Sequence, residues 1–222
     1  MKRREFSAQL GLSTLGLLAA SGGAQAQGGF VEGQHYQRLG QPLPSTPGKI
    51  EVVEFFWYGC PHCFAFEPEI SAWAKQLPAD VSFRQVHVSF RANVAFHQKV
   101  FFALEAMGKE AQVHTAIFDA IHRYGQSLDD VKTVAGFVAK LGVDPAKFEE
   151  SFNSFTVNTK CMQAKKLSED YRIDGVPALG VAGRFLTSPA MSSAGLRISE
   201  VESGKRALQV VDTLIQRIRK GG

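Results

Sequence analysis

Cysteine is scarce in this chain, with three residues among 222, which is too few for a framework of structural disulfides. No apolar run approaches the roughly 20 residues that a membrane-spanning helix needs. A hydrophobic content of 45% with 21% charged residues excludes a disordered or collagen-like chain. The formal net charge is only +4, so the composition does not predict nucleic-acid binding.

The first residues have the layout of a secretory signal peptide. The cationic head Lys2-Arg3-Arg4 precedes a short apolar stretch over residues 10–20, and Ala24-Gln25-Ala26 has small residues where a signal peptidase reads them. A buried N-terminal helix is the alternative. Cleavage near Ala26 would leave 196 residues with a net charge of +2. We therefore expect a protein of an oxidising compartment such as the periplasm, by the general or the twin-arginine export route.

The hydrophobic pattern predicts an α/β domain interrupted by a helical domain. Strands are expected over residues 50–57 and 81–90, with a helix from residue 61 to about residue 76 between them, and this order implies a parallel crossover. A helical block follows. Strand character returns at residues 176–181 and 184–187. The predicted α/β domain comprises residues 27–92 and 172–222, and the helical insertion comprises residues 93–171.

Several helix ends are predicted from capping residues. Ser127 and Asp130 have the spacing of a capping box, before a helix that reaches Leu141. Asp144 precedes a proline at the first helical position. The C-terminal helix, expected over residues 199–220, should pack on the sheet. Its expected apolar face comprises Val201, Leu208, Val211, Leu214, Ile215 and Ile218.

Cys60-Pro61-His62-Cys63 lies between the first predicted strand and its helix. A C-x-x-C motif in a strand–helix–strand unit is typical of a thioredoxin-like redox site. At a helix start, unpaired N–H groups and the helix dipole stabilise a Cys60 thiolate, and a protonated His62 would add to this effect. A stabilised reduced form makes the disulfide a strong oxidant. Cys63, one turn further on, is expected to be more buried and to act as the resolving thiol.

A cysteine pair has two other common uses. A structural zinc site needs four ligands, but Cys161 is the only further cysteine and no second C-x-x-C or H-x₃-H motif exists. A purely structural disulfide would close too small a loop to add much stability. We therefore predict no metal and no cofactor other than the Cys60–Cys63 disulfide itself.

Glu54 interrupts the apolar first strand six residues before Cys60. Burying a carboxylate costs free energy unless it has a partner or stays protonated, so Glu54 is predicted to exchange a proton with Cys63. A solvent-facing strand position is the alternative. Val176-Pro177 opens the later strand, and a cis peptide there would turn the Val176 backbone toward the cysteines and an extended substrate. The residues alone do not select that isomer.

Glu54, the C-P-H-C motif, Pro68 and Val176-Pro177, in this order, resemble the thioredoxin superfamily and, more closely, the DsbA family of periplasmic thiol:disulfide interchange proteins. The resemblance covers nearly the whole chain after residue 26. It implies an α/β thioredoxin-like fold with an inserted all-helical domain and a cis Pro177. It also implies reoxidation by a quinone-linked inner-membrane partner of the DsbB type.

The same resemblance implies that Cys60 is the nucleophile, Cys63 the resolving thiol and His62 the tuning residue. Three features depart from the family pattern. Gly59, before the first cysteine, is smaller than the aromatic residue of some members, which would alter the substrate groove. Members often have a lysine near the buried acid on the second strand, where this chain has Arg84-Gln85-Val86, and Cys161 is an additional cysteine. We expect Cys161 to be a buried core thiol rather than a redox group.

Other aromatic and histidine side chains receive structural interpretations. Three aromatic residues flank the cysteines: Trp57, Tyr58 and Phe64. We expect part of this set to form an apolar rim around the cysteines and the rest to belong to the core. Four histidines show no metal spacing and are expected to be ordinary packed or surface side chains: His87, His97, His114 and His122.

The sequence therefore predicts a monomeric protein dithiol oxidase. It would donate the Cys60–Cys63 disulfide to reduced, newly exported proteins through a mixed disulfide at Cys60. A disulfide reductase or isomerase is one alternative, and a measurement of the redox potential would distinguish it from an oxidase. A non-catalytic substrate-binding module that reuses the fold is the other.

Overall fold

The computed structural model describes residues 29–44 and 47–221, so the predicted signal peptide at residues 1–26 lies outside the described residues. In the described chain, strands form a sheet in the order β1-β5-β4-β2-β3. Their bounds are β1 (Gln37–Arg38), β2 (Ile50–Phe56), β3 (Val81–His87), β4 (Ala178–Val181) and β5 (Phe185–Thr187). Strands β2 and β3 are parallel and are connected through helix α1 (Pro61–Ala74), which confirms the predicted crossover.

Strand β2 fixes the position of the cysteine motif. It pairs in parallel with β3 from Ile50 to Phe56 and antiparallel with β4, where Phe55 lies opposite Ala178. Because Ala178 begins β4, the preceding Pro177 lies at the end of the sheet where β2 finishes. The chain leaves β2 at this end and enters α1 at Pro61, so Cys60 and Pro177 come together there.

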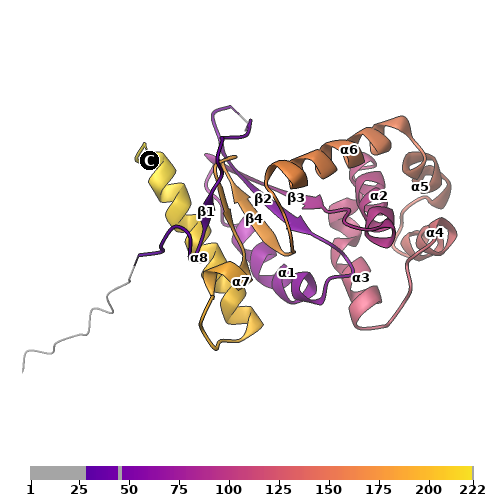
Figure 1. Cartoon of the computed structure of the whole chain (residues 1–222). Coiled ribbons are helices and arrows are strands. Elements are labelled where there is room, and N and C mark those ends of the chain that lie inside the picture. The colour runs from indigo at the N-terminus through magenta and orange to yellow at the C-terminus, as the bar shows by residue number, and fades with distance from the viewer. Residues whose placement is uncertain (1–28, 45–46, 222) are drawn as a thin grey trace, which may run out of the picture.

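The predicted helical block is confirmed between β3 and β4. It comprises α2 (Ala92–Ala106), α3 (Glu110–His122), α4 (Val131–Ala139), α5 (Pro145–Phe152) and α6 (Phe155–Asp170). Figure 1 shows these helices gathered beyond the β3 edge of the sheet. One continuous cluster of buried apolar side chains joins them to β2, since Phe55 and Phe56 belong to the same cluster as Phe101, Phe118 and Phe148.

The C-terminal part of the chain packs against the sheet at the end away from the helical block. The short α7 (Pro189–Ser192) contacts α8 (Glu200–Arg219), and α8 packs against α1, β4 and β5, as predicted (Figure 1). A second apolar cluster joins α8 to the sheet. Within the described residues, no helix is long and apolar enough to cross a membrane.

Three local predictions were wrong. Ser127 does not begin a capping box; Asp130 is itself the N-cap of α4, and its carboxylate accepts the Thr133 N–H. Val201 is 44% exposed, because it lies in the first turn of α8 and burial begins only at Gly204. Cys161 is half-buried at the edge of the core rather than fully enclosed.

Gly204 sets the distance between α8 and α1. A Cβ atom at this position would lie 2.7 Å from Cδ2 of Phe66 in α1, which is closer than real carbon contacts. Although alanine gains about 1 kcal/mol of helix propensity over glycine, we expect Gly204→Ala to destabilise the protein by about 1–2 kcal/mol through overpacking.

Gly136 in α4 provides the matched control, because a Cβ atom there would meet nothing within 4 Å. Gly136→Ala should therefore stabilise the protein by about 1 kcal/mol. Urea unfolding of both variants measures the two changes in free energy. Equal stabilisation by the two substitutions would contradict the packing argument.

Candidate functional site

Cys60 is the N-cap residue of α1. Its backbone is extended, with φ −87° and ψ 117°, and its sulfur accepts the Cys63 backbone N–H at 3.4 Å. Pro61 occupies the first helical position, where the absence of an N–H costs nothing. The Cys60 thiol also lies 3.4 Å from the carbonyl oxygen of Val176, to which it donates. The sequence order therefore places the sulfur at the end of the helix where negative charge is most stable.

The two cysteines of the motif have opposite acidities. Hydrogen bonding from Cys63 to the sulfur, together with the His62 charge, lowers the pKa of Cys60 to about 6. Burial raises the pKa of the Cys63 thiol well above its usual value, because that side chain is only 1% exposed. Both are free thiols in the structure. At neutral pH, negative charge is therefore stable on Cys60 and unfavourable on Cys63.

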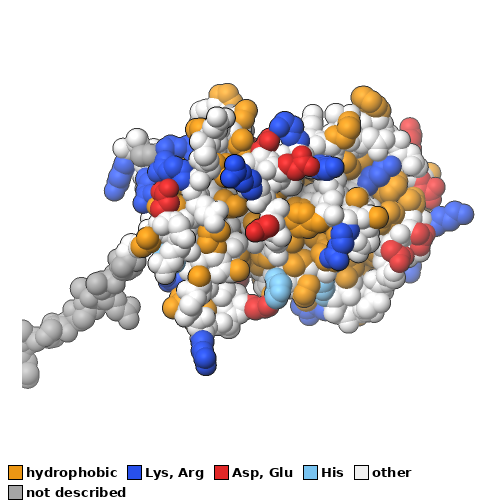
Figure 2. Space-filling view, viewed as in Figure 1, with side chains coloured by type: hydrophobic (Ala, Val, Ile, Leu, Met, Phe, Trp, Pro, Cys, Tyr) orange, Lys and Arg blue, Asp and Glu red, His pale blue; other side chains and the backbone are white. Residues whose placement is uncertain are grey.

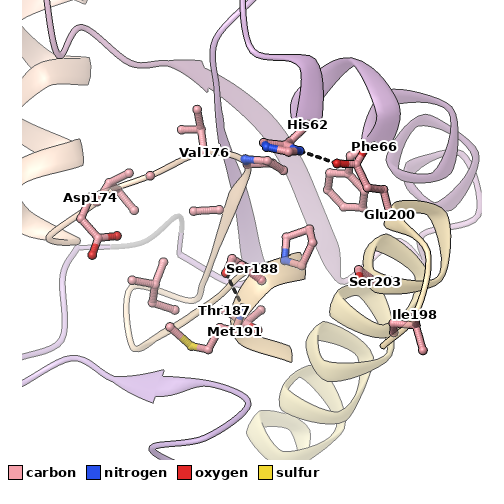
Figure 3. A pocket seen from close by; sticks show the side chains of 17 residues that line it. His62, Phe66, Asp174, Val176, Thr187, Ser188, Met191, Ile198, Glu200 and Ser203 are labelled. Atoms are coloured by element: carbon pink, nitrogen blue, oxygen red, sulfur yellow. Dashed lines mark hydrogen bonds and ion pairs between the residues drawn. The ribbon is translucent and has the colours of Figure 1, made fainter. Parts of the chain in front are cut away.

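His62 is exposed at the start of α1 and is held by a residue of α8. Its Nδ1 lies 2.5 Å from Oε1 of Glu200, the first residue of that helix, as the dashed line in Figure 3 shows. Both side chains are more than half exposed, so solvent screens the pair and its contribution to stability is small. The contact links the cysteine motif to the start of α8.

A groove of about 390 Å³ opens beside the motif. Residues from α1, from the segment before β4, from β5 and α7, and from around the start of α8 line it, including His62, Phe66, Pro177, Met191 and Ile198 (Figure 3). The Val176–Pro177 peptide bond is cis, as the family resemblance implied. Figure 2 shows hydrophobic side chains over the middle of one face of the molecule, next to a histidine. The groove can hold an extended apolar segment.

The expected aromatic rim is only partly present. Trp57 and Phe64 are half-buried, whereas Tyr58 is fully buried and belongs to the core. The Tyr58 hydroxyl donates to a carboxylate, Oε1 of Glu110 in α3, at 3.1 Å. Tyr58 is therefore a link between the end of β2 and the helical block.

Glu54 is buried, with 1% of its surface exposed, so the solvent-facing alternative is wrong. The amide of Gln85 in β3 donates to its Oε2 at 2.9 Å. Burial, with the negative charge of Glu67 as the next cause, raises the pKa of Glu54 to about 8. Glu54 is also near enough to Cys63 for its charge to raise the pKa of that thiol. The structure thus places a buried carboxyl group, whose raised pKa keeps it mostly protonated at pH 7, within electrostatic range of the buried sulfur.

Sequence reasoning missed three members of this buried polar group: Glu67, Glu110 and His114. His114 in α3 hydrogen-bonds to Glu110 through Nδ1 and lies 3.1 Å from Oε2 of Glu67 in α1 through Nε2. The spacing of Glu110 and His114, four residues apart on one helix, was a visible signal of this pair. Nothing local indicated that Glu67 would meet them, because α1 and α3 are adjacent only in the folded chain.

Metal binding has no candidate site in the part of the chain that the structure describes, where no group of three or more His, Cys, Asp or Glu side chains could hold an ion. His87 is fully buried, and its Nε2 accepts the Tyr58 backbone N–H at 3.2 Å. His97 accepts the indole N–H of Trp57, and His122 contacts the Tyr58 carbonyl oxygen. These three histidines are packed side chains.

Known proteins resemble this chain over most of its length. The family described as DSBA-like thioredoxin domain matches residues 91–197. Thiol:disulfide interchange protein DsbA of Azotobacter vinelandii is 46% identical over 188 residues, which is 84% of each chain. That of Burkholderia cepacia is 40% identical over 210 residues, covering 95% of this chain and 93% of the relative. The crystal structure of Pseudomonas aeruginosa DsbA is similar with a TM-score of 0.80 and 40% identity, over 86% of this chain and 96% of that one.

Proposed function

Since the chain belongs to the DsbA family of thiol:disulfide interchange proteins, we propose that Cys60 and Cys63 cycle between disulfide and dithiol to oxidise reduced, newly exported proteins. The chain is a thiol:disulfide oxidoreductase whose redox group is its own cysteine pair. The opposite acidities of the two cysteines are the observation that carries the assignment of their roles.

The first chemical step is attack by a substrate thiolate on the sulfur of Cys60. A bond forms between the substrate sulfur and the Cys60 sulfur, the Cys60–Cys63 bond breaks, and the electron pair of that bond stays on Cys63. Burial makes that thiolate unfavourable, so it takes a proton, and the neutral Glu54 is the nearby acid that supplies it. Cys63 is thereby left as a thiol.

The second step releases the product. Another thiolate of the substrate attacks the substrate sulfur of the mixed disulfide, and Cys60 leaves with the electron pair. Its low pKa makes it a good leaving group, because the thiolate stays stable at neutral pH without a proton. The substrate has lost two electrons and gained a disulfide, and the protein now holds two reduced cysteines.

Substrate alignment is assigned to Val176, Pro177 and the groove beside them. The Val176 carbonyl lies 3.4 Å from the Cys60 sulfur, so an extended segment that pairs there would place its own cysteine over Cys60. His62, which lines the same groove, is assigned the tuning of the Cys60 thiolate. The apolar lining suits unfolded chains rather than one fixed sequence.

The cycle requires a partner that removes two electrons from the reduced pair. We assign this role to a quinone-linked inner-membrane oxidase of the DsbB type, on the ground of family membership. The N-terminal pattern and this membership support a periplasmic location after cleavage near Ala26.

Titration of the Cys60 thiolate tests this assignment directly. The ultraviolet absorbance of the reduced protein minus that of the oxidised protein should rise with a midpoint near pH 6. Cys161 does not interfere, because burial raises its pKa to about 11. Cys60→Ser should remove the transition, which assigns it. A midpoint near the ordinary thiol pKa of 9.0 would contradict the oxidase assignment.

A further inference from the structure

A buried group of polar side chains that includes Glu54 joins the sheet to the helical block. Its members come from four elements: Glu54 from β2, Glu67 from α1, Gln85 from β3, and Glu110 and His114 from α3. His114 lies at the centre, since its two ring nitrogens contact Glu67 and Glu110. The rings of Phe56, Tyr58 and Phe118 surround the imidazole, with centroids 5.2–5.4 Å away, and exclude water.

The hydrogen bonds of His114 favour a positive charge on its ring. Each ring nitrogen has a carboxylate oxygen as its partner, and only the doubly protonated imidazolium can donate from both nitrogens at once. The side chains of His114, Glu67 and Glu110 are only 7%, 8% and 14% exposed. Two carboxylates this deeply buried need such a cation. Burial opposes the charge, but the hydrogen bonds to Glu110 and Glu67 outweigh it and raise the pKa of His114 to about 10.

The other groups that face His114 carry no positive charge. Tyr58, whose hydroxyl lies 3.2 Å from Nδ1, is neutral because burial raises its pKa well above 10. His87 in β3 is neutral because burial lowers its pKa well below 6.5. Gln85, the β3 residue beside Glu54, is an amide, and its Nε2 lies 3.3 Å from Nε2 of His114. The positive charge that faces Glu54 in this group therefore comes from α3.

We propose that His114 is a positioning residue that makes the Glu54 proton exchangeable. Its imidazolium offsets the charges of Glu67 and Glu110, so Glu54 can give its proton to the departing Cys63 sulfur and then exist as a carboxylate until water reprotonates it. Without that cation, Glu54 would ionise next to two uncompensated carboxylates. The inference rests on the proposed role of Glu54 and extends it to a residue of the helical insertion.

Infrared spectroscopy tests the inference without an activity assay. The carbonyl band of a protonated carboxyl group should disappear in the wild-type protein with a midpoint near pH 8, and Glu54→Gln should remove the band, which assigns it. His114→Gln should move the midpoint upward by about one pH unit or more, a tenfold change in the ionisation constant. An unchanged midpoint would overturn the proposal.

A positive charge supplied from β3 instead of His114 tests whether the role of His114 is electrostatic or structural. Gln85 contacts Glu54 at 2.9 Å and Glu67 at 3.4 Å, so Gln85→Lys added to His114→Gln would place an ammonium group in the same cluster. The double variant should return the midpoint toward pH 8. His97→Gln, the matched control, removes a partly buried histidine whose pKa is lowered by burial, and should leave the midpoint unchanged.

A measurement on the unmodified protein covers the case in which His114→Gln does not fold. The carbon and nitrogen chemical shifts of the His114 ring should be those of imidazolium up to about pH 9. A neutral ring at pH 8 would refute the proposal. If Cys60→Ser abolishes dithiol oxidation but His114 proves neutral, the proposed function stands and only this inference fails.

Discussion

Cys63→Ser is expected to stop the reaction at a mixed disulfide on Cys60, whereas Cys60→Ser is expected to form no adduct. With glutathione disulfide as the reagent, the Cys60 thiolate displaces one glutathione thiolate and becomes linked to the other half. In the wild type, Cys63 then attacks Cys60, releases the second glutathione and closes the protein disulfide. Serine cannot make that attack, so the adduct persists.

The size of the effect follows from the two acidities. A thiol with a pKa of about 6 is roughly 90% ionised at pH 7, whereas one at the ordinary value of 9.0 is about 1% ionised. Cys63 lies well above that ordinary value and is 1% exposed, so both ionisation and access oppose its reaction. We expect the Cys60→Ser variant to react at least about a hundredfold more slowly.

Intact mass spectrometry measures the addition of one glutathionyl group. All proteins in the series should carry Cys161→Ala, because the third thiol is half-buried and a slow adduct there would confuse the comparison. The Cys161→Ala protein with the intact motif is the matched control and should end as the protein disulfide with no adduct. An adduct on Cys60→Ser but not on Cys63→Ser would reverse the assigned roles of the two cysteines.

The cysteine motif and the fold could be predicted from the sequence because both depend on local patterns. Cys60-Pro61-His62-Cys63 lies between a β-rich run and a helix start, and the helical spacing of apolar residues marked the block after β3. Helix caps were predicted where a proline fixes the first position, as at Asp144. The capping box at Ser127 failed because two polar residues competed for one helix start, and Asp130 lies next to the helix.

The electrostatics around Glu54 could not be predicted in the same way. A carboxylate within an apolar strand indicated a buried acid, and the absence of a lysine in Arg84-Gln85-Val86 indicated that its countercharge was missing or displaced. The structure shows that His114 takes part in this cluster from α3, sixty residues further along the chain. Contacts of this kind depend on how α3 packs against α1, and no periodicity in either helix encodes the partner.

The reduced protein is expected to gain stability over the oxidised protein as the pH rises from 6 to 9. Cys60 has a pKa of about 6 in the folded dithiol form and 9.0 when unperturbed. Between these values the folded reduced chain binds fewer protons than the unfolded one, so its stability rises by about 1.4 kcal/mol per pH unit. The disulfide form has no Cys60 thiol to titrate and lacks this contribution.

The sign of the effect follows from the lowered pKa. Stabilisation of the reduced form is fully present at about pH 9 and is lost as the pH falls through 6. Its full size, about 4 kcal/mol, corresponds to the difference between the two pKa values of Cys60. Above pH 9 the difference should fall again, because the unfolded chain ionises Cys63 whereas the folded chain keeps it protonated.

Urea unfolding of the reduced and oxidised forms between pH 5 and pH 9 measures this difference. Glu54, whose raised pKa costs stability as the pH rises from 4.5 to about 8, is expected to contribute to both forms, since its two main causes, burial and the charge of Glu67, do not involve the cysteines. The double variant Cys60→Ser/Cys63→Ser reports that shared background. Loop closure by the disulfide does not depend on pH. The pH dependence of the stability difference between the two forms therefore reports the ionisation of Cys60. Parallel stability curves for the two forms would show that the Cys60 thiolate does not drive oxidation, since a disulfide is a strong oxidant only when its reduced form is the more stable one.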